Sequence, residues 1–121
     1  MASLVDEVMV VEDEPESRAY LVQLLEFEGF KVIAFANGAE ALDDLRVRQN
    51  LPCLIVLDMR MPVMDGPQFR AAMLLDPRLA TIPVVVVTAF EPSAASKMSA
   101  LRVFRKPIDI DAFLGTVREN C

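Results

Sequence analysis

Acidic residues follow two of the short apolar runs in this sequence. The run VMVV (8–11) is followed by Glu12 and Asp13, and the run CLIVL (53–57) is followed by Asp58. If these runs are neighbouring strands, the three carboxylates lie together and hold their protons more tightly unless a cation relieves their repulsion. Oxygen ligands at an open, wet site suit Mg²⁺. The pattern therefore predicts a magnesium site.

Two further apolar runs end in a hydroxyl and an ammonium group. VVVV (84–87) is followed by Thr88, and VF (103–104) is followed by Arg105 and Lys106. A lysine can neutralise a second anion, and a threonine hydroxyl can donate a hydrogen bond. Carboxylates, a divalent cation, an ammonium group and a hydroxyl around one point indicate phosphoryl transfer, with an aspartate as nucleophile. Each residue alone has a plainer interpretation as part of a solvated loop, turn or surface, so the prediction depends on the combination.

Short β-branched runs alternate with segments of helical spacing along the chain. The runs lack apolar–polar alternation, which predicts strands buried on both faces of a parallel sheet. Leucines and aromatic residues at helical spacing predict helices between them. We therefore predict a (βα)5 flavodoxin-like three-layer α/β domain with sheet order 2-1-3-4-5. The fourth helix, within residues 92–100, has the weakest pattern because it holds few large apolar residues.

Length and charge limit the possible functions. The 121 residues predict one domain spanning 1–121, and a net charge of −6 argues against direct nucleic-acid binding. The absence of histidine excludes a catalytic histidine, a histidine metal ligand and a phosphohistidine within this chain.

No apolar run approaches the roughly 20 residues of a membrane span, and the first residues lack a signal peptide's basic start. We expect a cytoplasmic protein with no membrane contact. In that compartment Cys53 and Cys121 are expected to be reduced thiols.

The motifs together resemble one known family. VVEDEP (10–15), LDMRMPVMDG (57–66), VTA (87–89) and RKPID (105–109) are similar to the motifs of receiver domains of bacterial two-component response regulators. The resemblance extends from about residue 5 to residue 119. It implies a CheY-like fold and a phosphorelay signalling role, in which the domain catalyses its own aspartyl phosphorylation and dephosphorylation without being an enzyme for other substrates.

The resemblance also assigns roles to individual residues. It implies that Asp58 is the phosphoacceptor and that Glu12, Asp13, Asp58 and the backbone carbonyl of Arg60 hold Mg²⁺. Thr88 and Lys106 would contact the bound phosphoryl group. The phosphoryl donor would be a sensor histidine kinase or a histidine phosphotransfer protein; the output partner is unknown, and a homodimer is compatible with the pattern.

Other motif residues are expected to shape the site. Pro62 and Gly66 would form the loop after Asp58, and Pro107 would follow a cis peptide bond that aims the lysine inward. Met59, Met61 and Met64 are expected to be packing residues.

The sequence departs from the family pattern in two ways. The usual aromatic residue three places before the lysine is Val103 here, and Phe104 should face the opposite side of the sheet. The span between Thr88 and Lys106 is short by roughly one helical turn, about four residues.

The large side chains of Arg60 and Phe90 are expected to border the path of water to the acyl phosphate and to slow its hydrolysis.

Two alternative functions remain open at this point. One is a receiver-like interaction module that does not use phosphorylation. Val103 and the short span leave it open, although the presence of all five site residues argues against it: Glu12, Asp13, Asp58, Thr88 and Lys106. The other is a Mg²⁺-dependent phosphatase of small esters, although such enzymes commonly carry a second aspartate where this chain has Arg60. Nucleotide binding is disfavoured because neither glycine-rich phosphate-binding motif is present.

Overall fold

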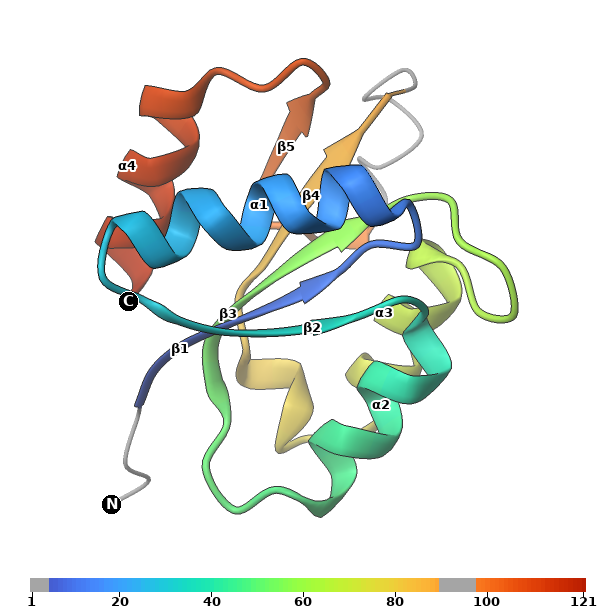
Figure 1. The fold of residues 1–121 in the computed structure, drawn as a ribbon. Coiled ribbons are helices and arrows are strands. Elements are labelled where there is room, and N and C mark those ends of the chain that lie inside the picture. Colours follow the sequence, from blue (N-terminus) through green and yellow to red (C-terminus); the bar gives the residue numbers. More distant parts are fainter. Residues whose placement is uncertain (1–4, 90–97) are drawn as a thin grey trace.

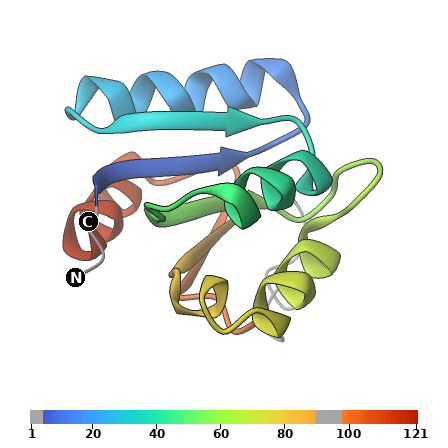
Figure 2. The ribbon, with the colours of Figure 1, turned by 90° about the horizontal axis from the view of Figure 1, so that it is seen from below.

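The fold is a five-stranded sheet with helices on both faces (Figures 1 and 2). The computed structural model describes residues 5–89 and 98–121. Its strands are β1 (Val5–Val11), β2 (Lys31–Phe35), β3 (Pro52–Asp58), β4 (Val84–Thr88) and β5 (Arg102–Arg105). Its helices are α1 (Pro15–Phe27), α2 (Gly38–Val47), α3 (Gly66–Leu75) and α4 (Ile110–Asn120), with a short 3-10 helix, η1 (Leu79–Thr81). In this described part, no helix is both long and apolar enough to cross a membrane.

All neighbouring strands are parallel, and their order is β2-β1-β3-β4-β5. The predicted flavodoxin-like fold and strand order are therefore confirmed. Val11 of β1 pairs with Leu57 of β3, so the residues that follow these two positions leave the sheet side by side. Because every strand runs the same way, the carboxyl ends of β1, β3, β4 and β5 meet at one edge.

Two apolar layers hold the helices on the sheet. One face carries α1 and α4, whose buried side chains include Leu25 and Phe113. The other face carries α2 and α3, with Leu45 and Phe69 in the core. The central strand β3 is buried from Pro52 to Leu57, which explains its continuous apolar run. Most of the predicted fourth helix, within 92–100, lies outside the described ranges. The described ranges contain four α-helices.

Polar caps fix where each helix begins after its strand. Glu14 accepts hydrogen bonds from two backbone N–H groups at the start of α1, and Asn37 and Asp109 do the same once each for α2 and α4. Asp65 and Gln68 form a reciprocal capping box at the start of α3. These caps set the lengths of the loops that connect the sheet edge to the helices.

The expectation of two reduced thiols was wrong. Cys53 and Cys121 form a disulfide, with their Cα atoms 5.3 Å apart. The 68-residue separation hides this proximity in the sequence. A helix that follows a parallel strand runs back along the sheet, so the end of α4 returns to the edge where β3 begins (Figure 1). The bond thus lies at the edge opposite Asp58.

Gly66 is required by the close approach of two backbone segments. A Cβ atom at this position would lie 2.6 Å from the carbonyl oxygen of Asp58 and 3.0 Å from the Cα of Met59. The Gly66 N–H also donates to the Met59 carbonyl at 3.0 Å. The predicted role of Gly66 in shaping this loop therefore has a steric basis: the loop folds back tightly on the end of β3.

We expect Gly66→Ala to destabilise the protein by about 1–3 kcal/mol, because backbone atoms cannot yield as a flexible side chain does. Gly115→Ala is the matched control. Gly115 lies inside α4 with nothing within 4 Å of an added Cβ, so alanine there should stabilise the fold by about 0.5–1 kcal/mol. Urea unfolding of both variants measures the difference. Equal effects of the two substitutions would contradict this account of the loop.

Candidate functional site

Three carboxylates meet at the ends of β1 and β3. Ligand oxygens of Glu12, Asp13 and Asp58 all lie within 4.8 Å of one another. The register of β1 with β3 produces this cluster, because each acidic group immediately follows or ends a paired strand. Glu12 is 1% exposed, whereas Asp13 and Asp58 are half-buried and reach solvent. The structure therefore brings together the three residues that the sequence predicts as metal ligands.

Lys106 provides the positive charge next to this cluster. Its ammonium nitrogen lies 2.6 Å from Oε1 of Glu12, whose carboxylate is buried. The backbone of Lys106 is held by a hydrogen bond from its N–H to the carbonyl oxygen of Thr88, at 2.7 Å. The predicted cis peptide bond between Lys106 and Pro107 is present. In the described structure, the lysine thus pairs with a predicted metal ligand.

The environment of Asp58 favours its protonated form. Burial is the main cause, followed by the hydrogen bond and the charge of Glu12, and together they raise the pKa of Asp58 from 3.8 to about 7. The positive charge of Lys106 and the hydrogen bond from the Met59 N–H, at 2.9 Å, act in the opposite direction but are weaker. Asp58 therefore holds its proton more tightly than a free aspartate, and a cation at this point would offset the part of the shift that comes from the charge of Glu12.

Thr88 lies at the end of β4, where it is buried. It pairs in register with Arg105, and Asp58 pairs with Val87, so Thr88 is one position beyond the phosphoacceptor candidate. This arrangement places Thr88 between β3 and β5 at the same sheet edge. The hydroxyl, the aspartate and the lysine are thus supplied by three adjacent strands.

Val103 and Phe104 face opposite sides of the sheet, as predicted. Val103 is half-buried against the core between the sheet and the α2–α3 layer. Phe104 is buried on the other face, where its ring meets the ring of Phe113 edge-on at 5.6 Å. The aromatic residue of β5 is therefore fixed in the α1–α4 core and does not adjoin the helix layer that contains α3.

The loop after Asp58 contains most of the remaining predicted positions. Arg60 and Pro62 are exposed. The methionines of this loop pack against the core, Met61 as a buried residue and Met59 and Met64 as partly buried ones, which confirms their predicted role. Phe90 lies outside the described residues.

Arg18 is a site residue that the sequence analysis missed. Its Nη1 donates to the carbonyl oxygen of Glu12 at 2.9 Å and to that of Asp13 at 3.2 Å. The guanidinium therefore fixes the backbone of the acidic pair without touching its carboxylates. The only signal in the sequence is a single cation in the first turns of an otherwise acidic helix start, EDEPESR (12–18).

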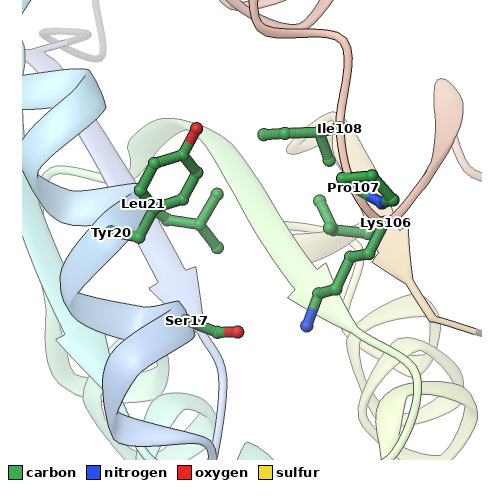
Figure 3. Close-up of a pocket in the computed structure, with 7 residues that line it drawn as sticks. Ser17, Tyr20, Leu21, Lys106, Pro107 and Ile108 are labelled. Carbon is green, nitrogen blue, oxygen red and sulfur yellow. The ribbon is translucent and has the colours of Figure 1, made fainter.

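A pocket of about 440 Å³ adjoins Lys106 (Figure 3). It lies between α1 and the segment after β5, and its wall is mainly apolar, from Tyr20, Leu21 and Ile108. Ser17 and Lys106 supply polar groups to the pocket, and the ammonium group of Lys106 lies 2.6 Å from the Glu12 carboxylate. The pocket thus borders Lys106, which in turn pairs with Glu12 of the carboxylate cluster.

Comparison with known proteins identifies the class. The family model for the response regulator receiver domain matches residues 8–118. The chain is 31% identical over 115 residues to the polar-differentiation response regulator DivK of Brucella anthropi, covering 92% of each chain. It is also 31% identical over 119 residues to the sporulation initiation phosphotransferase F of Bacillus subtilis, covering 94% of this chain and 92% of that one.

A solved structure agrees with these relatives. The signal receiver domain of a signal transduction histidine kinase from Syntrophus aciditrophicus superimposes with a TM-score of 0.87 at 28% identity, covering 95% of this chain and 89% of that chain. The protein belongs to the response regulator receiver domain family, the signalling domains of two-component systems.

The raised pKa of Asp58 makes the stability of the metal-free protein depend on pH. Unfolded Asp58 loses its proton near pH 3.8, whereas folded Asp58 keeps it until about pH 7. The folded state binds more protons over this window, so stability falls as the pH rises through it, and the loss is complete above the folded pKa. We expect Asp58→Asn to change stability little at about pH 4 and to increase it by about 1–2 kcal/mol at about pH 8, after allowance for solvent screening.

Urea unfolding in the presence of a chelator, at both pH values, measures this effect. Asp43→Asn is the control, because Asp43 is exposed on α2. The same stabilisation by Asp58→Asn at both pH values would show that the effect does not come from the ionisation of Asp58.

Proposed function

We propose that this protein is a phosphoacceptor receiver domain, spanning residues 1–121, that takes a phosphoryl group onto Asp58 with the help of Mg²⁺. The observation that carries the proposal is the grouping of three carboxylates within 4.8 Å, with the ammonium group of Lys106 2.6 Å from one of them. Carboxylates this close need a cation, and an aspartate between a cation and a lysine is suited to in-line attack on phosphorus.

The residues present fit a magnesium ion. Carboxylate oxygens are the ligands that Mg²⁺ prefers, and Asp13 and Asp58 are open enough to leave coordination positions for water and a phosphate oxygen. Glu12, Asp13, Asp58 and the carbonyl of Arg60 would hold the ion. When bound, it would neutralise the carboxylates and the charge that develops on the phosphoryl group.

The side chains around Asp58 then have distinct tasks. A carboxylate oxygen of Asp58 forms the new bond to phosphorus while the bond from phosphorus to the donor's nitrogen breaks, which gives an acyl phosphate. The ammonium group of Lys106 would leave its ion pair with Glu12 and pair with the phosphoryl oxygens. The hydroxyl of Thr88 would donate a hydrogen bond to the same oxygens. Arg18 would keep the backbone of Glu12 and Asp13 in place, as its hydrogen bonds of 2.9 and 3.2 Å support.

The donor must be another molecule, because this chain contains no histidine. A sensor histidine kinase or a histidine phosphotransfer protein has the required phosphohistidine. The pocket between α1 and Ile108, with the exposed ring of Tyr20 at its edge, supports binding of such a partner next to Lys106. We propose that the exchange takes place in the cytoplasm.

Phosphorylation would change the surface around β4 and β5. It adds about −1.5 to −2 charges at Asp58. Thr88 and Lys106 are joined by a backbone hydrogen bond of 2.7 Å, so attraction of both side chains to the phosphoryl group would move the two strand ends together. Because Phe104 is packed against Phe113, this movement would reach the surface through the backbone and Val103, without rotation of an aromatic ring.

Incubation with Mg²⁺ and an acyl phosphate, followed by intact-mass measurement, tests the proposal. We expect the mass of one added phosphoryl group on the wild type and on the control Asp43→Asn, and none on Asp58→Asn. Removal of Mg²⁺ by a chelator should abolish the addition. Beryllofluoride should shift the NMR signals of Thr88 and Lys106 in the wild type and in Asp43→Asn, but not in Asp58→Asn.

Two other outcomes would support different functions. No phosphorylation by either a small acyl phosphate or a phosphohistidine protein would favour a receiver-like interaction module. Sustained release of phosphate from small phosphate esters would favour a Mg²⁺-dependent phosphatase, which the exposed Arg60 two positions after Asp58 argues against, because an acid–base group is needed there.

A further inference from the structure

We propose that the disulfide between Cys53 and Cys121 is a reversible redox site that controls the order of the last turn of α4. The bond joins the beginning of β3 to the residue that caps α4. It lies at the opposite edge of the sheet from Asp58, so the proposal does not depend on Asp58 accepting phosphate.

The fold does not need this bond as a permanent staple. Phe113 and Val117 of α4 are fully buried in the core, and Phe113 packs edge-on against Phe104. A domain of 121 residues also buries enough surface to fold without covalent help. Reduction should therefore leave the sheet and most of α4 in place.

The structure can accommodate both redox states of Cys53. Its sulfur lies 3.4 Å from the carbonyl oxygen of Glu7, within the range of an S–H hydrogen bond. The reduced thiol can donate to that oxygen without movement of β1 or β3. A buried cysteine with a ready acceptor is thus stable as a thiol as well as in a disulfide.

The bond is more open to solvent at Cys121 than at Cys53. Cys121 is half-buried, whereas Cys53 is only 7% exposed, in the wall of a surface pocket of about 330 Å³ that it shares with Leu51, Pro83 and Asn120. Attack by an external thiol should therefore occur at the sulfur of Cys121, the more exposed residue of the two.

The exchange needs two external thiols, such as two molecules of reduced glutathione, and its electrons and protons balance. A thiolate of the first molecule attacks Sγ of Cys121, the S–S bond breaks, and Cys53 leaves as a thiolate that takes up a proton. A thiolate of the second molecule then attacks the external sulfur of the mixed disulfide and releases Cys121, which is protonated in turn. Two electrons and two protons pass to the protein, and the two external thiols become a disulfide.

Loss of the bond would act on the last turn of α4. Without it, this turn is held by the Arg118–Glu28 ion pair at 3.2 Å, the hydrogen bond from Asn120 to Thr116 at 2.8 Å and the N–H of Cys121 to Val117 at 3.0 Å. Arg118 is exposed and its pair with Glu28 contributes little. The turn would fray in the reduced protein and be ordered in the oxidised one.

A redox titration of the full chain tests this proposal. The protein is equilibrated in buffers with increasing ratios of reduced to oxidised glutathione, and its free thiols are counted after denaturation. We expect zero thiols in the oxidising buffers, two in the reducing buffers, and full recovery of the bond on return. The melting temperature should fall by about 10 °C or more on reduction, because the bond closes a long loop.

Two further measurements separate the proposed effect from a general loss of stability. Backbone amides of residues 119–121 should exchange much faster after reduction, while amides of β3 stay protected. The rate of phosphorylation by an acyl phosphate should change less than about twofold, because the two sites are far apart. The double variant Cys53→Ser, Cys121→Ser is the control for the reductant, and its melting temperature should not respond to it.

Three results would overturn the proposal. The bond could survive a large excess of reduced glutathione, which would make it permanent. The air-oxidised protein could contain two free thiols or a bond between two molecules. Reduction could also leave the exchange rates of residues 119–121 and the melting temperature unchanged. If the variants fail to fold, the titration of the wild type still decides between these results.

Discussion

Mutual repulsion of three carboxylates is the constraint on which the site depends. The parallel pairing of β1 with β3 forces Glu12, Asp13 and Asp58 to within 4.8 Å of one another. Burial and the neighbouring Glu12 raise the pKa of Asp58 to about 7, which favours its protonated form, and the ammonium group of Lys106 lies 2.6 Å from Glu12. A divalent cation would replace both compensations at once. The same repulsion that destabilises the metal-free state therefore favours binding of the metal.

A rigid frame holds these charges in position. β3 is buried along its length up to Leu57, and polar caps fix the start of each helix. The backbone of the acidic pair is held by Arg18, and that of Lys106 by Thr88. The feature that can change is the partner of the Lys106 side chain. This change needs only a small movement at the edge of the sheet that carries Asp58, and the disulfide lies at the opposite edge.

The sequence was sufficient for the features that repeat along the chain. Continuous β-branched runs predicted the parallel strands, and polar residues at the ends of β1, β3, β4 and β5 predicted which side chains meet. Alternation along β5 correctly placed Val103 and Phe104 on opposite faces. The sequence was insufficient for contacts between residues that are far apart in the sequence or that involve backbone atoms. The disulfide joins residues 68 positions apart, and the hydrogen bonds of Arg18 go to backbone oxygens that no motif marks.

The most direct test of this account is the Mg²⁺ dissociation constant of Lys106→Met compared with the wild type, measured by calorimetry. If Lys106 competes with the metal for Glu12, its removal should tighten Mg²⁺ binding by about 3- to 10-fold. Arg105→Met, which removes the neighbouring positive charge, should have a smaller effect. Unchanged or weaker Mg²⁺ binding by Lys106→Met would contradict the account.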